Sequence, residues 1–267
     1  MFLSQDYFTD KEYEQAFFEF GGARRKIAEK VREISTIEEG VILDLLSGHG
    51  LLSAEMAIRF PKSRILGIGL HNDVITFKQV LKSDYFSQET WAQFHYLVCN
   101  ATSMPIKSAT CDIVTNFLGL EDVHMTTGRS GVEKAIDEVE RITKKDALIQ
   151  ISFVEYGNSP AEVLTREIWD SIGLDAIFYE REEYLRMFEA RRMYPLEEFE
   201  IRIKKKMTPK QAKEELKFAC EEAPIVFSNF GVTSIKFEDL WSKFGERLEK
   251  HGMAFWSQIH VLILSRT

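Results

Sequence analysis

The sequence predicts an α/β protein with a doubly wound, mainly parallel seven-stranded sheet whose last strand is antiparallel. It also predicts an N-terminal helical segment and a helical cap inserted before the last strand. Three observations favour this architecture. Within residues 41–154, helical segments separate most of five short apolar runs, of the kind buried in a sheet covered on both faces. The first run leads through a small-residue turn into a helix. Beyond residue 154, the pattern changes to several helices and two further strands.

Residues 1–40 form the predicted N-terminal helical segment. Apolar residues recur at helical spacing between residues 10 and 34, and Gly21-Gly22 interrupts them, so we expect two helical pieces. Packing against the sheet is the simpler role for this segment. The other role is a lid over a ligand site, with the run Gly-Gly-Ala-Arg-Arg at 21–25 adding backbone N–H groups beside it.

The stretch 41–50, Val-Ile-Leu-Asp-Leu-Leu-Ser-Gly-His-Gly, is the centre of the prediction. We expect a strand over 41–46 that contains Asp44, then a turn, then a helix over about 50–60. Glycines let the backbone approach a ligand closely, and a helix N-terminus offers free N–H groups. The alternative is an ordinary tight turn between a strand and a helix.

Further strands are predicted at 64–70, 95–101, 111–120 and 147–154, with an amphipathic helix at 131–145. Ligands of doubly wound sheets bind beyond the carboxyl ends of the strands. The predicted site therefore lies along the segments that follow the strands, at 44–50, 69–73, 100–103, 116–120 and 155–158.

Residues after 154 supply the predicted cap. Helical patterns at 160–173 and 179–192 precede an alternating strand at 197–207. Two helices and a final strand follow, and the two strands are expected to pair antiparallel at the sheet edge. We therefore divide the chain into the N-terminal segment at 1–40, a core at 41–207, a cap insertion at 208–252 and a final core strand at 253–267.

The chain carries 34 basic and 42 acidic residues, a formal net charge of −8. This balance disfavours general binding to nucleic acid or to anionic membranes. Residues 181–213 are a local exception with ten Lys/Arg and six Asp/Glu, and they leave an RNA-binding alternative open. No apolar run is long enough to span a bilayer, and the N-terminus lacks a signal-peptide pattern. The three cysteines lack metal-ligand spacing, which predicts free thiols, no metal and a cytoplasmic location.

Four motifs, in this order, resemble those of class I S-adenosylmethionine-dependent methyltransferases. They are ILDLLSGHG, ILGIGLHND, CNATSMPIKSATCDIVTNF and IDEVERITKKDALIQIS. The resemblance covers about residues 41–154 and implies a Rossmann-like fold, a methyltransferase activity and S-adenosylmethionine as the cofactor.

By this resemblance, several residues would surround the cofactor. The methionine part would lie at Asp44, Gly48 and Gly50, and the adenine beside Asn100 and Ala101, whose Asn amide can hydrogen-bond a base edge. The remaining implied contacts are Leu46 in the first turn, Gly69 and Leu70 at the end of the second strand, and Asn116 and Phe117 at the methyl-transfer end.

The sequence departs from the family pattern at several of these positions. Leu46 stands where the first motif has a glycine, and Gly69 where an acid holds the ribose hydroxyls. Loss of a charge-assisted contact of about 1.5–3 kcal/mol would weaken cofactor binding by roughly one to two decades, unless Asp73, His71 or a residue of the N-terminal helix compensates. Asn100 replaces an acid, and Lys145-Asp146 replaces a Pro-Gly-Gly turn. These departures keep open a methyltransferase-like binding module without catalysis.

The acceptor is expected to be a small molecule. Methyl transfer mainly requires alignment, so the sequence says little about the acceptor beyond the groups near it. A base is needed when the acceptor must lose a proton, and His124 is the first candidate because its ordinary pKa suits that work. Tyr156 is the second. We expect no nucleic-acid or membrane partner, and a homodimer stays open. A dinucleotide-dependent oxidoreductase is disfavoured because the ribose acid and the full three-glycine fingerprint are missing.

Overall fold

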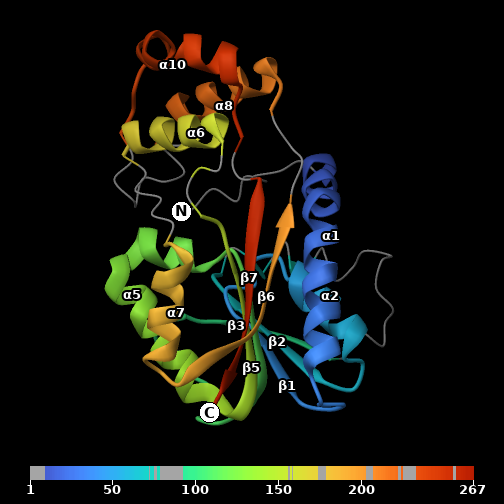
Figure 1. Ribbon diagram of the computed structural model, residues 1–267. Helices are drawn as coiled ribbons and strands as arrows, with labels where there is room; N and C mark the ends of the chain where they lie inside the picture. Colours follow the sequence, from blue (N-terminus) through green and yellow to red (C-terminus); the bar gives the residue numbers. More distant parts are fainter. Residues whose placement is uncertain are drawn as a thin grey trace.

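The fold is that of a computed structural model, shown in Figure 1, which places most of the chain. Side chains are described from residue 22 onward. The described residues are 10–71, 73–74, 77–78, 93–155, 157, 159–173, 179–202, 207–221, 224, 233–254 and 257–267.

A seven-stranded sheet forms the middle layer, with the order β3-β2-β1-β4-β5-β7-β6. The first five strands pair in parallel, and β7 runs antiparallel to both β5 and β6. The predicted fold class is therefore confirmed. The strands are β1 (Val41–Asp44), β2 (Arg64–Gly69), β3 (Phe94–Val98), β4 (Cys111–Phe117), β5 (Thr143–Phe153), β6 (Met193–Arg202) and β7 (Gln258–Arg266).

Helices cover both faces of this sheet. Figure 1 places α1 (Asp10–Ile34) and α2 (Leu51–Arg59) on one face, and α5 (Leu120–Ile142) and α7 (Arg181–Glu189) on the other. Each pair closes its own apolar core against the strands. Such double coverage explains why β1 and β4 are buried along nearly their whole length rather than at alternate residues.

The N-terminal helix is continuous, so the predicted break at Gly21-Gly22 is wrong. Ala23, Ile27 and Val31 are buried in the core that α1 shares with α2. A glycine in a helix costs only about 0.5–1 kcal/mol, less than burial of one large apolar side chain contributes. Packing therefore decides the helix where local propensity predicts an interruption.

Two other boundaries differ from the prediction. Helix α5 begins at Leu120, but Gly128 has non-helical angles (φ 68°, ψ −172°) that divide it, so its second part begins close to the predicted residue 131 and only its first part was not predicted. Strand β5 begins at Thr143, ahead of the predicted 147, because the strand resumes after a bulge opposite Cys111 and Ile113. Asp146 adopts a left-handed φ of 62° at this bulge, which supplies the bend expected of the missing Pro-Gly-Gly turn.

A helical layer stands beyond the carboxyl ends of the parallel strands (Figure 1). It consists of α6 (Pro160–Ser171), α8 (Pro209–Glu221) and α10 (Phe237–His251), which share one apolar cluster. Thus α6, which precedes β6 in the chain, packs with the two helices that lie between β6 and β7. Within the described part of the chain, no helix combines the length and apolarity needed to cross a membrane.

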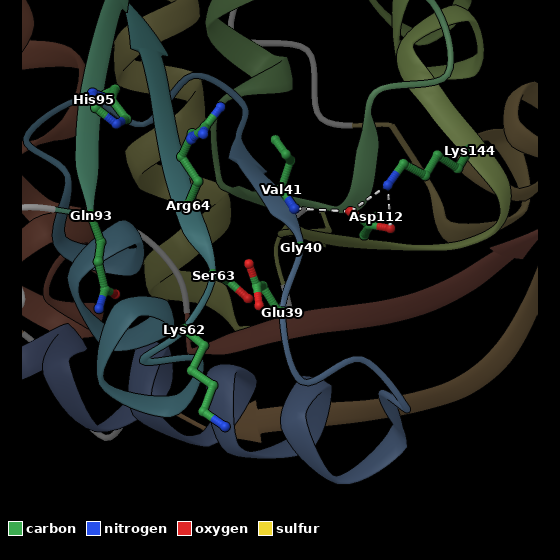
Figure 2. Close-up of a pocket in the computed structure, with 10 residues that line it drawn as sticks. All are labelled: Glu39, Gly40, Val41, Lys62, Ser63, Arg64, Gln93, His95, Asp112 and Lys144. Atoms are coloured by element: carbon green, nitrogen blue, oxygen red, sulfur yellow. Dashed lines mark hydrogen bonds and ion pairs between the residues drawn. The ribbon is translucent and has the colours of Figure 1, made fainter.

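The amino ends of three strands are joined by one carboxylate, that of Asp112 at the start of β4. Its Oδ2 accepts a hydrogen bond from the backbone N of Val41 at 2.9 Å, and Lys144 Nζ of β5 lies 2.8 Å from Oδ1 (Figure 2). Gly40 lies directly against this carboxylate, because a Cβ there would stand 2.7 Å from Asp112 Oδ2 and 3.1 Å from Ile37 Cδ1. The close approach therefore requires glycine at residue 40.

We expect Gly40→Ala and Gly22→Ala to change stability in opposite directions. The Gly40 methyl must displace a pinned carboxylate, which should lower the free energy of unfolding by about 1–3 kcal/mol. At Gly22, inside α1, an added Cβ meets nothing within 4 Å, so alanine there should raise the free energy of unfolding by about 0.5–1 kcal/mol. Urea unfolding of both variants measures the difference, and a Gly40→Ala protein as stable as Gly22→Ala would contradict this account.

Candidate functional site

Asp44 joins β1 to its neighbours at the carboxyl edge of the sheet. Its side chain is 1% exposed. Its Oδ2 accepts hydrogen bonds from Ser53 N at 2.9 Å and from Ser53 Oγ, and Thr115 Oγ1 donates to Oδ1 at 3.3 Å. Burial raises the pKa of Asp44 to about 6, and the Ser53 hydrogen bonds offset part of that rise. The carboxylate thus holds the first turn of α2 and β4 in place while it borders the site.

The turn after Asp44 uses its two glycines differently. Gly48 has a φ of 48°, and a Cβ added there would meet nothing within 4 Å. Gly50, the N-cap of α2, has a φ of 78°, and a Cβ there would overlap the ring of Phe77. Gly50 is therefore required by packing. Gly48 instead leaves backbone open to a ligand, which is the property expected of this turn.

Leu46 adopts a backbone conformation that favours glycine. Its φ is 57°, in the left-handed region that costs a branched residue of order 1–3 kcal/mol. Its side chain packs against Gly119, where an added Cβ would stand 2.7 Å from Leu46 Cβ. Leu118, at the end of β4, also has a positive φ of 55°. Both strained residues border the same cavity, as is common at ligand sites.

That cavity, called here the turn cavity, has a volume of about 210 Å³. It opens between the carboxyl ends of β1 and β4, and Arg24 of α1 forms part of its wall. Four of the residues predicted to bind the cofactor line it: Asp44, Leu46, Gly48 and Phe117. The other residues in its wall are Arg24, Ser47, His49, Leu51, Leu52, Leu118 and Asp122.

Gly69 ends β2 beside an acid from the next helical turn. Asp73 Oδ2 accepts a hydrogen bond from Leu70 N at 2.9 Å and lies 3.5 Å from Tyr96 Oη. A Cβ on Gly69 would stand 3.0 Å from that same Asp73 oxygen. The Tyr96 hydroxyl lies closer still to that position, so Tyr96 and the Asp73 carboxylate together fill the space that a side chain at residue 69 would enter.

The predicted adenine-side residues lie further along this edge. Leu70 is 66% exposed and Val98 47% exposed, and Val98 pairs with Gly69 across the β2–β3 register. Asn100 Oδ1 accepts hydrogen bonds from Thr102 N and Thr102 Oγ1, both at 2.9 Å, and so stabilises its own turn. Ala101 is 3% exposed. Exposed apolar surface here, next to a fixed turn, is suited to covering by a flat ring.

Asn116 does not face the turn cavity. It is fully buried, its Nδ2 donates to Leu45 O at 2.7 Å, and its backbone O accepts from Gln150 Nε2 at 3.2 Å. The side chain thus links β4 to β1 across the sheet. Phe117, the next residue, does line the cavity.

The two residues predicted as bases have different outcomes. His124, in the first half of α5, lies with Nδ1 2.5 Å from Tyr179 Oη, and the two rings meet edge to face at 5.3 Å. It is absent from the wall of the turn cavity as that wall is described. Tyr156 lies outside the described residues.

Sequence reasoning gave Asp122 no part in the cofactor site. Asp122 lines the turn cavity, and its side chain keeps access to solvent although many protein atoms lie close to it. Burial against the concave wall raises its pKa to about 6, and the Asp73 carboxylate adds to the rise. Its position in the first turn of a helix, directly after a strand end, is the signal that could have found it.

Glu121 is the most perturbed acid near this edge. It is 6% exposed in the first turn of α5, and neither carboxylate oxygen has a hydrogen-bond partner among the described residues. Burial raises the pKa of Glu121 to about 8; nearby backbone N–H groups, its own and that of Val154, offset only a little of this rise. At neutral pH the side chain is therefore mostly a neutral acid.

A larger cavity of about 690 Å³ lies at the opposite edge, among the amino ends of the strands (Figure 2). The Asp112, Val41 and Lys144 cluster forms one side of it. It contains no glycine turn with open backbone and no start of a covering helix. Ligands of parallel sheets bind at the other edge, so the turn cavity is the candidate site.

Comparison with known proteins gives the family of this domain. Residues 43–151 match the family model described as a methyltransferase domain. No curated protein sequence matches the chain.

Solved structures share the fold at low sequence identity. The MccD protein is 14% identical, with a TM-score of 0.60 over 92% of this chain and 99% of that one. The [4+2]-cyclase SpnF is 16% identical, with a TM-score of 0.58 over 91% and 81%. Phosphoethanolamine N-methyltransferase 2 of Haemonchus contortus, crystallised with S-adenosyl-L-methionine, is 15% identical, with a TM-score of 0.57 over 99% and 59%. At these identities the likeness establishes the fold alone.

We expect Glu121→Gln to remove a pH dependence of stability. The unfolded chain releases this proton near the ordinary pKa of 4.5, whereas the folded protein keeps it up to about 8. Between these values the folded state binds more protons, so the free energy of unfolding falls as pH rises. We expect the free energy of unfolding of Glu121→Gln, relative to that of the wild type, to be higher at pH 8.5 than at pH 5 by about 1–4 kcal/mol. Denaturant unfolding of both proteins at the two pH values measures this difference. Glu189→Gln, at an exposed acid on α7, is the control, and an equal gain there would refute the assignment.

Proposed function

We propose that this chain is a class I S-adenosylmethionine-dependent methyltransferase and that it methylates a small-molecule acceptor at the turn cavity. The observation that carries the proposal is the open backbone of Gly48, held beside the buried Asp44 carboxylate at the carboxyl edge of the sheet. The matched family domain spans β1 to β5, and so includes every strand that contributes to this edge.

The residues around the turn cavity fit this cofactor. Asp44 and Asp122 line the cavity and Asp73 lies close to it, so the site carries an acidic field. S-adenosylmethionine carries a sulfonium and an ammonium group, and both suit such a field. Gly48 leaves room for a methionine chain to pass against backbone. The adenosyl part would then extend along the edge toward Leu70 and Ala101.

The chemistry asked of the protein is mainly alignment. When bound, S-adenosylmethionine supplies an electrophilic methyl group on sulfur. Holding an acceptor in line with that group can lower the barrier by about 7–11 kcal/mol. The strained Leu46 and Leu118, on the cavity wall with Phe117, form a rigid apolar border that would exclude water from the transfer end.

Charge pairing supports a small acceptor over RNA. The basic segment at 181–213 is largely neutralised where it is described. Arg181 lies 2.5 Å from Glu198, Arg191 2.5 Å from Asp137, and Arg192 3.4 Å from Glu140. The helical layer of α6, α8 and α10 stands beyond the same edge of the sheet. A cap of this kind suits a small ligand better than a polynucleotide.

His124 remains our proposal for a general base where the acceptor must lose a proton. Tyr179 fixes its ring through Nδ1, which leaves Nε2 as the nitrogen for proton transfer. Leu46 and Gly69 favour a second candidate function, a methyltransferase-like module that binds without catalysis. A cofactor-bound crystal structure with a clear path from the methyl group to the cap would count against that candidate.

Gly48→Ala is expected to weaken S-adenosylmethionine binding at least tenfold, because the added methyl enters the space beside the open backbone. Gly128→Ala is the matched control. Gly128 also has a positive φ, 68°, and an open Cβ direction, but it lies at the α5 kink outside the cavity wall. Isothermal titration compares the two variants with the wild type, and an equal loss of affinity in both would remove the assignment of Gly48.

Asp73→Asn should weaken binding of S-adenosylhomocysteine by roughly one to two decades, because a carboxylate that accepts both ribose hydroxyls is lost. The effect should be much smaller for its 2′-deoxyribose analogue, which presents one hydroxyl fewer. Titration of both ligands against both proteins forms a double-mutant cycle. Losses of the same size for the two ligands would indicate that Asp73 acts only by holding Leu70 N.

A further inference from the structure

Arg24 reaches the turn cavity because of the way α1 packs. Ala23, Ile27 and Val31 are buried in the core shared with α2, with relative exposures of 4%, 0% and 0%. Arg24 lies beside this buried stripe, at its N-terminal end, and is half-buried. The packing of Ala23, Ile27 and Val31 therefore fixes the orientation of α1, and this orientation places the Arg24 side chain in the wall of the turn cavity.

The guanidinium of Arg24 is held over an aromatic ring. Its Cζ lies 4.5 Å from the ring centroid of Phe117, the last residue of β4 and itself part of the cavity wall. Stacking of this kind orients the guanidinium plane and contributes about 0.5–2 kcal/mol. Burial lowers the pKa of His49, the Asp73 carboxylate raises it, and the charge of Arg24 lowers it further, so the guanidinium lies near the turn.

Arg24 differs in charge from the rest of the wall. Among the described residues that line the turn cavity, it alone carries a guanidinium or ammonium group, whereas Asp44 and Asp122 are acids. The cofactor of this family presents two cationic groups and one carboxylate. The acids suit the cations, and the carboxylate needs a donor that stays charged at every physiological pH. A planar guanidinium can bind a carboxylate through two parallel hydrogen bonds.

We propose that Arg24 binds the carboxylate of the cofactor's methionine part, so that the N-terminal helix completes the site. This inference rests on the proposed function, since it assigns a residue to the cofactor of that same reaction. It makes α1 a specificity element as well as a packing element. A ligand without the carboxylate should lose the contribution of this helix and keep that of the turn.

The test compares S-adenosylmethionine with decarboxylated S-adenosylmethionine, which lacks only that carboxylate. Isothermal titration of the full-length wild type should show about ten- to a hundredfold tighter binding of the carboxylated ligand. Arg24→Ala should bind the two ligands about equally, through loss of affinity for the carboxylated one alone. Arg24→Lys should show a preference for the carboxylated ligand that lies between those of the wild type and Arg24→Ala, because lysine keeps the charge but lacks the planar guanidinium.

Arg25→Ala is the matched control. Arg25 is the next residue on α1, has a side chain 52% exposed, and lies 4.0 Å from Glu55 outside the cavity wall. This variant should keep the wild-type preference. The role of Arg24 would be overturned if the wild type bound both ligands with equal affinity. It would also be overturned if Arg24→Ala lost affinity for both ligands to the same extent. The proposed function would stand in either case. Wild-type protein that binds neither ligand would overturn both.

Discussion

The site depends on the buried carboxylate of Asp44. It takes hydrogen bonds from the backbone and hydroxyl of Ser53 and from the hydroxyl of Thr115, so one side chain positions β1, β4 and the start of α2. With these partners it stays in place despite burial that raises its pKa to about 6. The orientation of the Gly48 backbone and the entry angle of α2 both follow from that single junction. The candidate site is thus built on an interaction internal to the protein.

The sheet was predictable because turn residues and helical segments separate its long apolar runs. The order of elements and the glycine turn follow from hydrophobic periodicity and residue type, whereas the antiparallel last strand was expected with the help of the family resemblance. The continuous α1 through Gly21-Gly22 and the first part of α5, ahead of the kink at Gly128, were not predicted, because both depend on burial against residues that are distant in the sequence. Sequence signals are local, whereas these outcomes depend on which distant face each helix meets.

The predicted site residues and the wall of the turn cavity overlap in part. Asp44, Leu46, Gly48 and Phe117 line the turn cavity because they belong to two strand ends. Arg24 comes from a helix far away in the sequence, which no motif spacing connects to β1. Asn116 was expected to face the ligand, but it turns inward to hydrogen-bond Leu45. Along a strand, one residue's shift reverses the side that a side chain faces, so neighbours such as Asn116 and Phe117 have different roles.

The position of β7 between β5 and β6 has a consequence for biosynthesis. During translation, β6 emerges well before the strand that must lie on its inner side, with α8 and α10 encoded between them. Until residues 258–266 leave the ribosome, β5 and β6 both present unpaired edges, which are sites for mispairing and for chaperone capture. The glutamates along β6 would protect its unpaired edge by their charge. Pro195, near the start of β6, has no backbone N–H to donate to a wrongly paired strand.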